Sequence, residues 1–80
     1  PAGGAIGVIR ISGDSAISIA DLVFTAKNNK SLGEAKGNTL HYGEIHDKEG
    51  VLLDEVVTSV YRAPHSYTGE DCVEFSCHGS

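Results

Sequence analysis

The residues from Cys72 to His78 alternate between groups that could do chemistry and groups that would pack in a core. Neighbouring residues of a strand face opposite sides of a sheet, so a strand here separates the two sets. One face carries the polar and ionisable side chains of Cys72, Glu74, Ser76 and His78. The opposite face carries Val73, Phe75 and Cys77. The second set predicts a core face, and the first is either a site or ordinary solvent-exposed surface.

A second charged group stands inside an apolar run. Residues 5–12 are rich in β-branched side chains and predict a strand that is apolar on both faces, and therefore central in a sheet. Arg10 interrupts that strand, and it needs a partner because an unpaired buried charge is costly. Two interpretations stay open. One is a structural ion pair with an acidic side chain on a neighbouring strand, and the other is a guanidinium that binds an anionic ligand group.

The cysteines do not suggest a disulfide framework. Cys72 and Cys77 are five residues apart on the predicted strand, so they face opposite sides and cannot bridge each other. A reducing, cytoplasmic setting fits this usage. The Cys77-His78 pair matches no zinc-ligand spacing, which disfavours a metal site. The remaining histidines are scattered, and we expect each to be a surface or hydrogen-bonded residue.

Composition narrows the classes of function. Eighty residues with 40% hydrophobic content correspond to one small domain. The net charge is -5 with only six Lys and Arg, which argues against a main docking surface for nucleic acid. No apolar run approaches the roughly 20 residues of a membrane-spanning helix. The Gly-x-x-x-x-Gly-Lys-Ser/Thr motif does not occur, so these residues offer no P-loop for a nucleotide.

Residues 15–24 predict a helix that packs on one face of a sheet. Ser12 or Asp14 is the expected N-cap. The apolar stripe of this helix recurs at helical spacing in Ala16, Ile19, Ala20 and Val23. We expect this stripe to be core, with no chemistry of its own.

The middle of the chain predicts a hairpin. Residues 26–38 are polar and predict an irregular connection. Residues 39–47 and 53–62 each predict a strand, and so short a link between them requires antiparallel pairing. The order of elements is strand, helix and three strands, which indicates an α+β fold with a mixed sheet.

Two segments carry a family resemblance: Gly4-Ala-Ile-Gly-Val-Ile-Arg-Ile-Ser-Gly13, and Arg62-Ala-Pro-His-Ser-Tyr-Thr-Gly-Glu-Asp-Cys-Val-Glu-Phe-Ser-Cys-His-Gly79. Together with Leu40-His-Tyr-Gly-Glu-Ile and Leu53-Asp-Glu-Val, they resemble the N-terminal domain of the TrmE (MnmE) family of tRNA modification GTPases. The resemblance covers nearly the whole chain. It implies that residues 1–80 are part of that domain. A first strand would precede Pro1, and the rest of the domain, a helical domain and a G domain would follow Ser80.

The resemblance implies a function for that domain. Such domains bind a tetrahydrofolate derivative (5-formyl- or methylene-tetrahydrofolate) and form a homodimer, and their fold is similar to the folate-binding module of the glycine-cleavage aminomethyltransferase. The full protein is cytoplasmic and works with the flavoprotein MnmG. It would modify C5 of the wobble uridine of tRNA with a folate one-carbon unit. GTP, Mg²⁺ and K⁺ would bind only in the G domain, so residues 1–80 alone are not expected to be catalytic.

The resemblance also assigns the site residues. Arg10 and Glu74 fall on the arginine and the glutamate that contact the folate in this family. A carboxylate can accept two hydrogen bonds from adjacent pterin N–H groups, and a guanidinium can bind the oxygen atoms or the glutamyl tail of the ligand. Residues 65–69 would shape the pocket or the dimer contact. Two alternatives remain: a free-standing folate-dependent protein of the aminomethyltransferase class, and a structural dimerisation module whose Arg10–Glu74 pair is only an ion pair.

Overall fold

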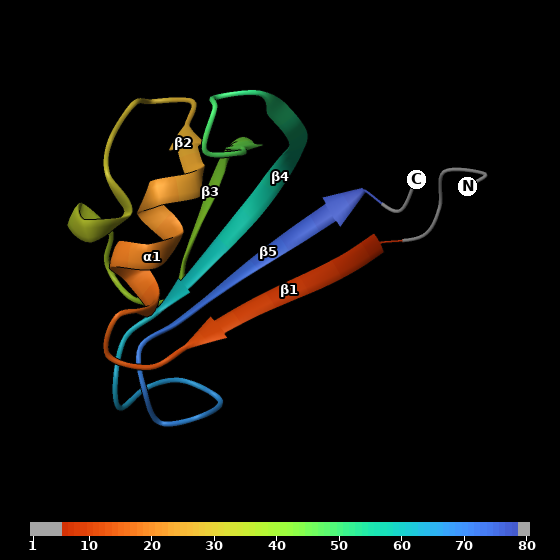
Figure 1. Cartoon of the computed structure of the whole chain (residues 1–80). Helices are drawn as coiled ribbons and strands as arrows, with labels where there is room; N and C mark the ends of the chain where they lie inside the picture. The colour runs from red at the N-terminus through yellow and green to blue at the C-terminus, as the bar shows by residue number, and fades with distance from the viewer. Residues whose placement is uncertain (1–5, 79–80) are drawn as a thin grey trace.

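Within residues 6–78, five strands form one sheet in the order β1-β5-β4-β3-β2, and one α-helix packs on one of its faces (Figure 1). The computed structural model describes residues 6–78. The elements are β1 Ile6–Ser12, α1 Ala16–Val23, β2 Phe24–Ala26, the 3-10 turn η1 Leu32–Glu34, β3 Thr39–His46, β4 Leu52–Tyr61 and β5 Cys72–His78. This is the expected α+β class.

The expectation of a mixed sheet is wrong for the strands described, because all four neighbouring pairs are antiparallel. The helix connects β1 to β2 at the opposite edge of the sheet, so it does not make a parallel crossover between neighbouring strands. The predicted hairpin of β3 and β4 is confirmed.

The first strand is also placed differently from the prediction. Among the described strands β1 lies at one edge and pairs with β5 alone. Its apolar side chains are not enclosed, since Val8 is 56% exposed and Ile9 is 54% exposed. An apolar run on both faces therefore does not distinguish a central strand from an edge strand. Ala5, the predicted first residue of this strand, lies outside the described residues.

Helix α1 begins one residue later than predicted and without the predicted cap. Its N-cap is Ser15, whose side chain makes no capping hydrogen bond, so neither Ser12 nor Asp14 has that role. The preceding turn uses Gly13 at φ 130°, a conformation that favours glycine. The helix buries Ala16, Ile17 and Ala20 against the sheet. Ile19, expected in the apolar stripe, is 47% exposed.

The polar segment between helix and hairpin is more ordered than its composition predicts. It contains η1, and Leu32 in this turn is only 1% exposed. From the helix, the carboxylate of Asp21 accepts hydrogen bonds from the Leu32 backbone N–H and from the Ser31 hydroxyl, both at 2.8 Å. The guanidinium of Arg62, after β4, donates to the carbonyl oxygens of Gly33 and Ala35 at 2.9 and 2.8 Å. Side chains remote in sequence thus fix this segment.

The core lies between α1, η1 and the sheet face formed by β2, β4 and β5. The predicted inward face of β5 is confirmed, because Val73 and Phe75 are buried and Cys77 packs against them. The rings of Phe24 and Phe75 lie 6.1 Å apart at 41°. Thr58 is fully buried, and its hydroxyl has no hydrogen-bond partner among the described residues.

In the part of the chain that the structure describes, no helix has the length and apolar character needed to cross a membrane.

Candidate functional site

Strand register brings the two predicted site residues into direct contact. Arg10 of β1 stands opposite Glu74 of β5, so their side chains project from the same face of the sheet. That face is opposite to the one on which Val73 and Phe75 meet the core. The Nε of Arg10 donates to Oε2 of Glu74 at 2.7 Å. The structure therefore joins two residues that lie 64 positions apart in the sequence.

The pair keeps hydrogen-bonding capacity for a further group. Side-chain exposure is 45% for Arg10 and 21% for Glu74, so both can be reached from solvent. Among the described residues the hydrogen bonds of this pair use only Nε and Oε2. The two terminal amino groups of Arg10 and the second carboxylate oxygen of Glu74 can therefore bind a planar polar ligand. The hydrogen bond to Glu74, and then its charge, raise the pKa of Arg10, which keeps the guanidinium protonated.

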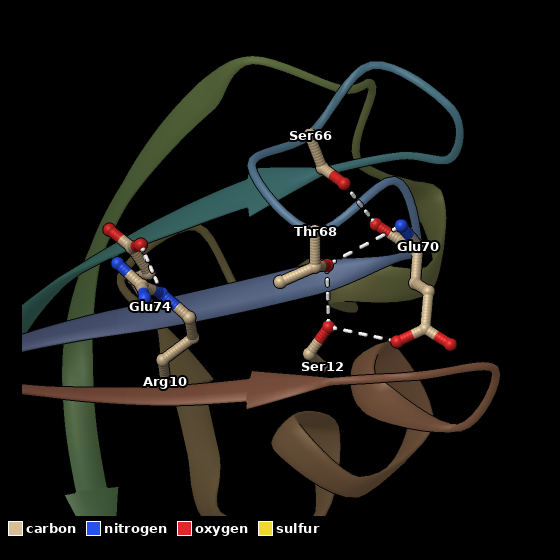
Figure 2. A network of polar contacts seen from close by, with 6 residues as sticks. All are labelled: Arg10, Ser12, Ser66, Thr68, Glu70 and Glu74. Atoms are coloured by element: carbon tan, nitrogen blue, oxygen red, sulfur yellow. Dashed lines mark hydrogen bonds and ion pairs between the residues drawn. The ribbon is translucent and has the colours of Figure 1, made fainter.

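A loop of residues 62–71 folds beside the pair and is tied to β1 (Figure 2). Ser12, the last residue of β1, shares a hydrogen bond of 2.7 Å with the hydroxyl of Thr68 and donates to the Glu70 carboxylate at 3.2 Å. The Ser66 hydroxyl donates to the backbone carbonyl of Glu70 within the loop. Within the loop, Gly69 has φ 82°, a conformation that favours glycine.

The two ends of this loop are closed by one residue. The carboxylate of Asp71 accepts a hydrogen bond from the Ala63 backbone N–H at 2.8 Å. The carbonyl of Asp71 accepts from the Gly13 N–H at 2.9 Å. The loop is thus anchored both to its own start and to the turn that follows β1. Sequence reasoning named residues 65–69 but missed Ser12 and Asp71, because their contacts depend on the strand register.

An aromatic side chain stands at the tip of the loop. Tyr67 is 87% exposed, and its ring centroid lies 5.2 Å from Cζ of Arg10. This distance is within the range of a cation–π contact. The loop thus places an aromatic ring against the guanidinium of the predicted site. Sequence reasoning did not single out this residue, although it lies inside the segment that carries the resemblance.

A hollow of about 350 Å³ has a lining that includes neither Arg10 nor Glu74. Its lining includes Lys27, Tyr42, Glu55, Val57, Ser76 and Cys77. Ser76 is two residues from Glu74 on β5 and therefore projects from the same face. Val57 of β4 stands opposite Ser76 and continues this face across the sheet. The arrangement joins an apolar wall to a few placed polar groups, as is typical of small-molecule sites.

The thiols near the site have little nucleophilic character. Burial, followed by the charge of Glu74, raises the pKa of Cys72. Burial, followed by the charge of Asp54, raises the pKa of Cys77. Both cysteines are free thiols, as predicted. A thiol with a raised pKa carries little thiolate at neutral pH, so neither is suited to covalent catalysis.

The histidines and acidic residues do not assemble a metal centre in residues 6–78, where no group of three or more His, Cys, Asp or Glu side chains could hold an ion. His41 hydrogen-bonds the hydroxyl of Thr39 at 2.8 Å, and His46 that of Thr25 at 2.9 Å. These two are hydrogen-bonded residues, as expected. The side chain of His78, predicted on the polar face, lies outside the described part.

The fold and the candidate site define a small α+β domain with a solvent-accessible ion pair on the open face of its sheet. A family model described as "GTP-binding protein TrmE N-terminus" matches residues 1–80. The tRNA modification GTPase MnmE of Flavobacterium johnsoniae is 57% identical over 77 residues, which cover 96% of this chain. The protein of the same name from Bacteroides fragilis is 56% identical over 79 residues, or 98% of the chain. That from Carboxydothermus hydrogenoformans is 51% identical over 77 residues, or 95% of the chain.

The chain belongs to the family of TrmE N-terminal domains, since the family model matches all 80 residues. It spans only 16–17% of the length of these relatives.

Proposed function

We propose that the chain is the tetrahydrofolate-binding and dimerisation domain of a GTPase that modifies tRNA. Such a GTPase would act in the cytoplasm with the flavoprotein MnmG, on C5 of the wobble uridine. Family membership supports this proposal, together with the printed name of the relatives, tRNA modification GTPase. A fold akin to the folate-binding module of aminomethyltransferases is part of the same proposal.

The observation that carries the folate proposal is the solvent-accessible Arg10–Glu74 pair on the open face of the sheet. The residues fit the ligand, because a carboxylate and a guanidinium stand side by side with unused acceptor and donor atoms. A carboxylate binds two adjacent N–H groups of a pterin edge, and Glu74 would orient the ring in this way. Arg10 would bind an oxygen atom or the anionic tail of the folate. When bound, the folate would supply the one-carbon unit.

A second candidate function, a structural dimerisation module, is favoured by the 2.7 Å contact itself. In that function the two charges neutralise each other and bind nothing else. The unused donor and acceptor atoms of these two solvent-accessible side chains favour the folate function instead.

A calorimetric titration of the intact protein with 5-formyltetrahydrofolate distinguishes the folate-binding function from the structural dimerisation module. We expect Glu74→Ala to weaken binding by more than about tenfold, because it removes a charge-assisted hydrogen bond to the ligand. Glu74→Gln, which keeps the shape but cannot accept two hydrogen bonds from the pterin edge, should also bind weakly. Glu49→Ala removes an exposed carboxylate in the β3–β4 turn and serves as the matched control. Unchanged affinity in a folded Glu74→Ala variant would refute the folate proposal.

A further inference from the structure

Tyr67 is a large aromatic residue that the fold holds in solvent. It is 87% exposed, so burial does not explain why the ring stands where it does. Its one described ring contact is with Arg10, at 5.2 Å from Cζ to the ring centroid. Arg10 in turn donates to Glu74. The ring is therefore connected to the two proposed ligand-binding side chains through a single contact.

The backbone on both sides of Tyr67 is held by hydrogen bonds (Figure 2). Ser66 on one side donates to the Glu70 carbonyl, and Thr68 on the other is bonded to Ser12. The bonds from Ser12 to Thr68 and Glu70 cross from β1 to the loop, and so fix the loop relative to Arg10 on the same strand. Such a loop is ordered before a ligand arrives, which lowers the entropic cost of binding.

We infer that Tyr67 is the aromatic wall of the ligand site, against which the planar ring of a pterin packs while Glu74 binds the edge of that ring. Ser12 is a positioning residue that acts through Thr68 and Glu70 to hold Tyr67 in place. This inference rests on the proposed folate function. It adds a surface for the face of the pterin ring, which the Arg10–Glu74 pair alone does not provide. A carboxylate recognises the N–H groups at the edge of a pterin, whereas its face requires an aromatic or guanidinium surface.

The chemistry of the two neighbours supports this division of roles. Tyrosine offers a large, rigid contact area with only two rotatable side-chain bonds, so little entropy is lost when a ring packs on it. The guanidinium of Arg10 is planar and also stacks on ring faces. The guanidinium of Arg10 lies over the Tyr67 ring and donates to the carboxylate of Glu74, so it links the aromatic ring to that carboxylate.

The test is a titration of the intact protein with 5-formyltetrahydrofolate, comparing Tyr67→Ala with Tyr67→Phe. We expect Tyr67→Ala to lose about tenfold in affinity, and Tyr67→Phe to stay within about twofold because it keeps the ring. Leu22→Ala removes another exposed apolar side chain, 76% exposed on the remote helix α1, and should bind like wild type. Melting temperatures should be the same for all three variants, because both Tyr67 and Leu22 are largely exposed and contribute little to the core.

A double-mutant cycle tests the positioning role of Ser12. Ser12→Ala should weaken binding by itself, but it should have no further effect in the Tyr67→Ala background, because Ser12 acts through that ring. Additive losses would overturn the role of Ser12. Wild-type affinity in Tyr67→Ala, with binding still lost in Glu74→Ala, would overturn the aromatic wall and leave the folate function standing. Absence of folate binding in the wild-type protein would overturn both.

Discussion

Replacing Gly43 by alanine should disrupt the pairing of β2 with β3. Gly43 lies in β3 opposite Ala26, next to the position where Phe24 of β2 enters the core. A Cβ at this position would lie 2.2 Å from the backbone oxygen of Thr25 and 2.6 Å from Cζ of Phe24. The first distance is more than 1 Å inside the 3.4 Å at which ordinary van der Waals contact begins. The methyl group therefore has no room unless β2 or the Phe24 ring moves.

The loss of stability depends on whether β2 or the Phe24 ring moves. Overpacking of a well-packed interior costs about 1–3 kcal/mol when neighbours shift slightly. Here one clashing atom belongs to the backbone, so the three-residue strand β2 must move away from β3. Displacement of the Phe24 ring would add part of the roughly 3–5 kcal/mol that removal of a buried phenylalanine costs. We expect Gly43→Ala to lower the free energy of unfolding by at least about 2 kcal/mol.

Equilibrium unfolding in urea, followed by far-ultraviolet circular dichroism, measures this change. Gly7→Ala in β1 is the matched control, because a Cβ there would meet no atom within 4 Å. Its free energy of unfolding should stay within about 0.5 kcal/mol of wild type. If Gly43→Ala unfolds at the wild-type midpoint with the wild-type slope, the packing argument for β2 is refuted.

Two further predictions concern buried polar groups. Thr58→Val keeps the branched shape but removes a buried hydroxyl that has no described partner, so unfolding should cost about 1 kcal/mol more in the same urea assay. A less stable variant would show that the hydroxyl is satisfied. Burial raises the pKa of both Cys72 and Cys77, so the folded chain keeps these protons above pH ~8.5, where an unfolded thiol loses its own. Stability should therefore fall as the pH rises past this value. The loss of stability with rising pH should be smaller in Cys72→Ala. A pH profile identical to that of wild type in this variant would contradict the raised pKa of Cys72.

Local patterns predicted the strands well because each strand carries its own signal. Alternation along residues 72–78 was enough to identify the buried face of β5, including Val73 and Phe75. The sequence-based predictions fail where the neighbours of a residue are distant in sequence. β2 has only three residues and follows the helix directly, so the helical pattern of residues 15–24 includes Phe24. Leu32 is buried within a polar segment because Asp21 and Arg62 hold that segment in place.

The candidate site was only partly accessible to the same reasoning. Arg10 is detectable because a charge inside an apolar strand is a local anomaly, whereas a carboxylate on a polar face is not, and only the family resemblance assigns a ligand role to Glu74. Whether they meet depends on the pairing of β1 with β5, which the sequence pattern does not specify. The bonds from Ser12 to Thr68 and Glu70 depend on the same pairing. Tyr67 carries no local signal, because an exposed tyrosine in a loop is unremarkable until its neighbour is known.

The pairing of β1 with β5 joins strands from the two ends of the described chain. The β3–β4 hairpin closes across a short turn held by Asp47, whereas the Arg10–Glu74 contact spans 64 positions of the chain. Closing a loop between residues distant in sequence carries the larger entropic cost, so we expect the Arg10–Glu74 contact to form after the β3–β4 hairpin. A ligand that bridges Arg10 and Glu74 would clamp the outermost described strand to its neighbour, and its binding free energy would oppose local opening of that edge.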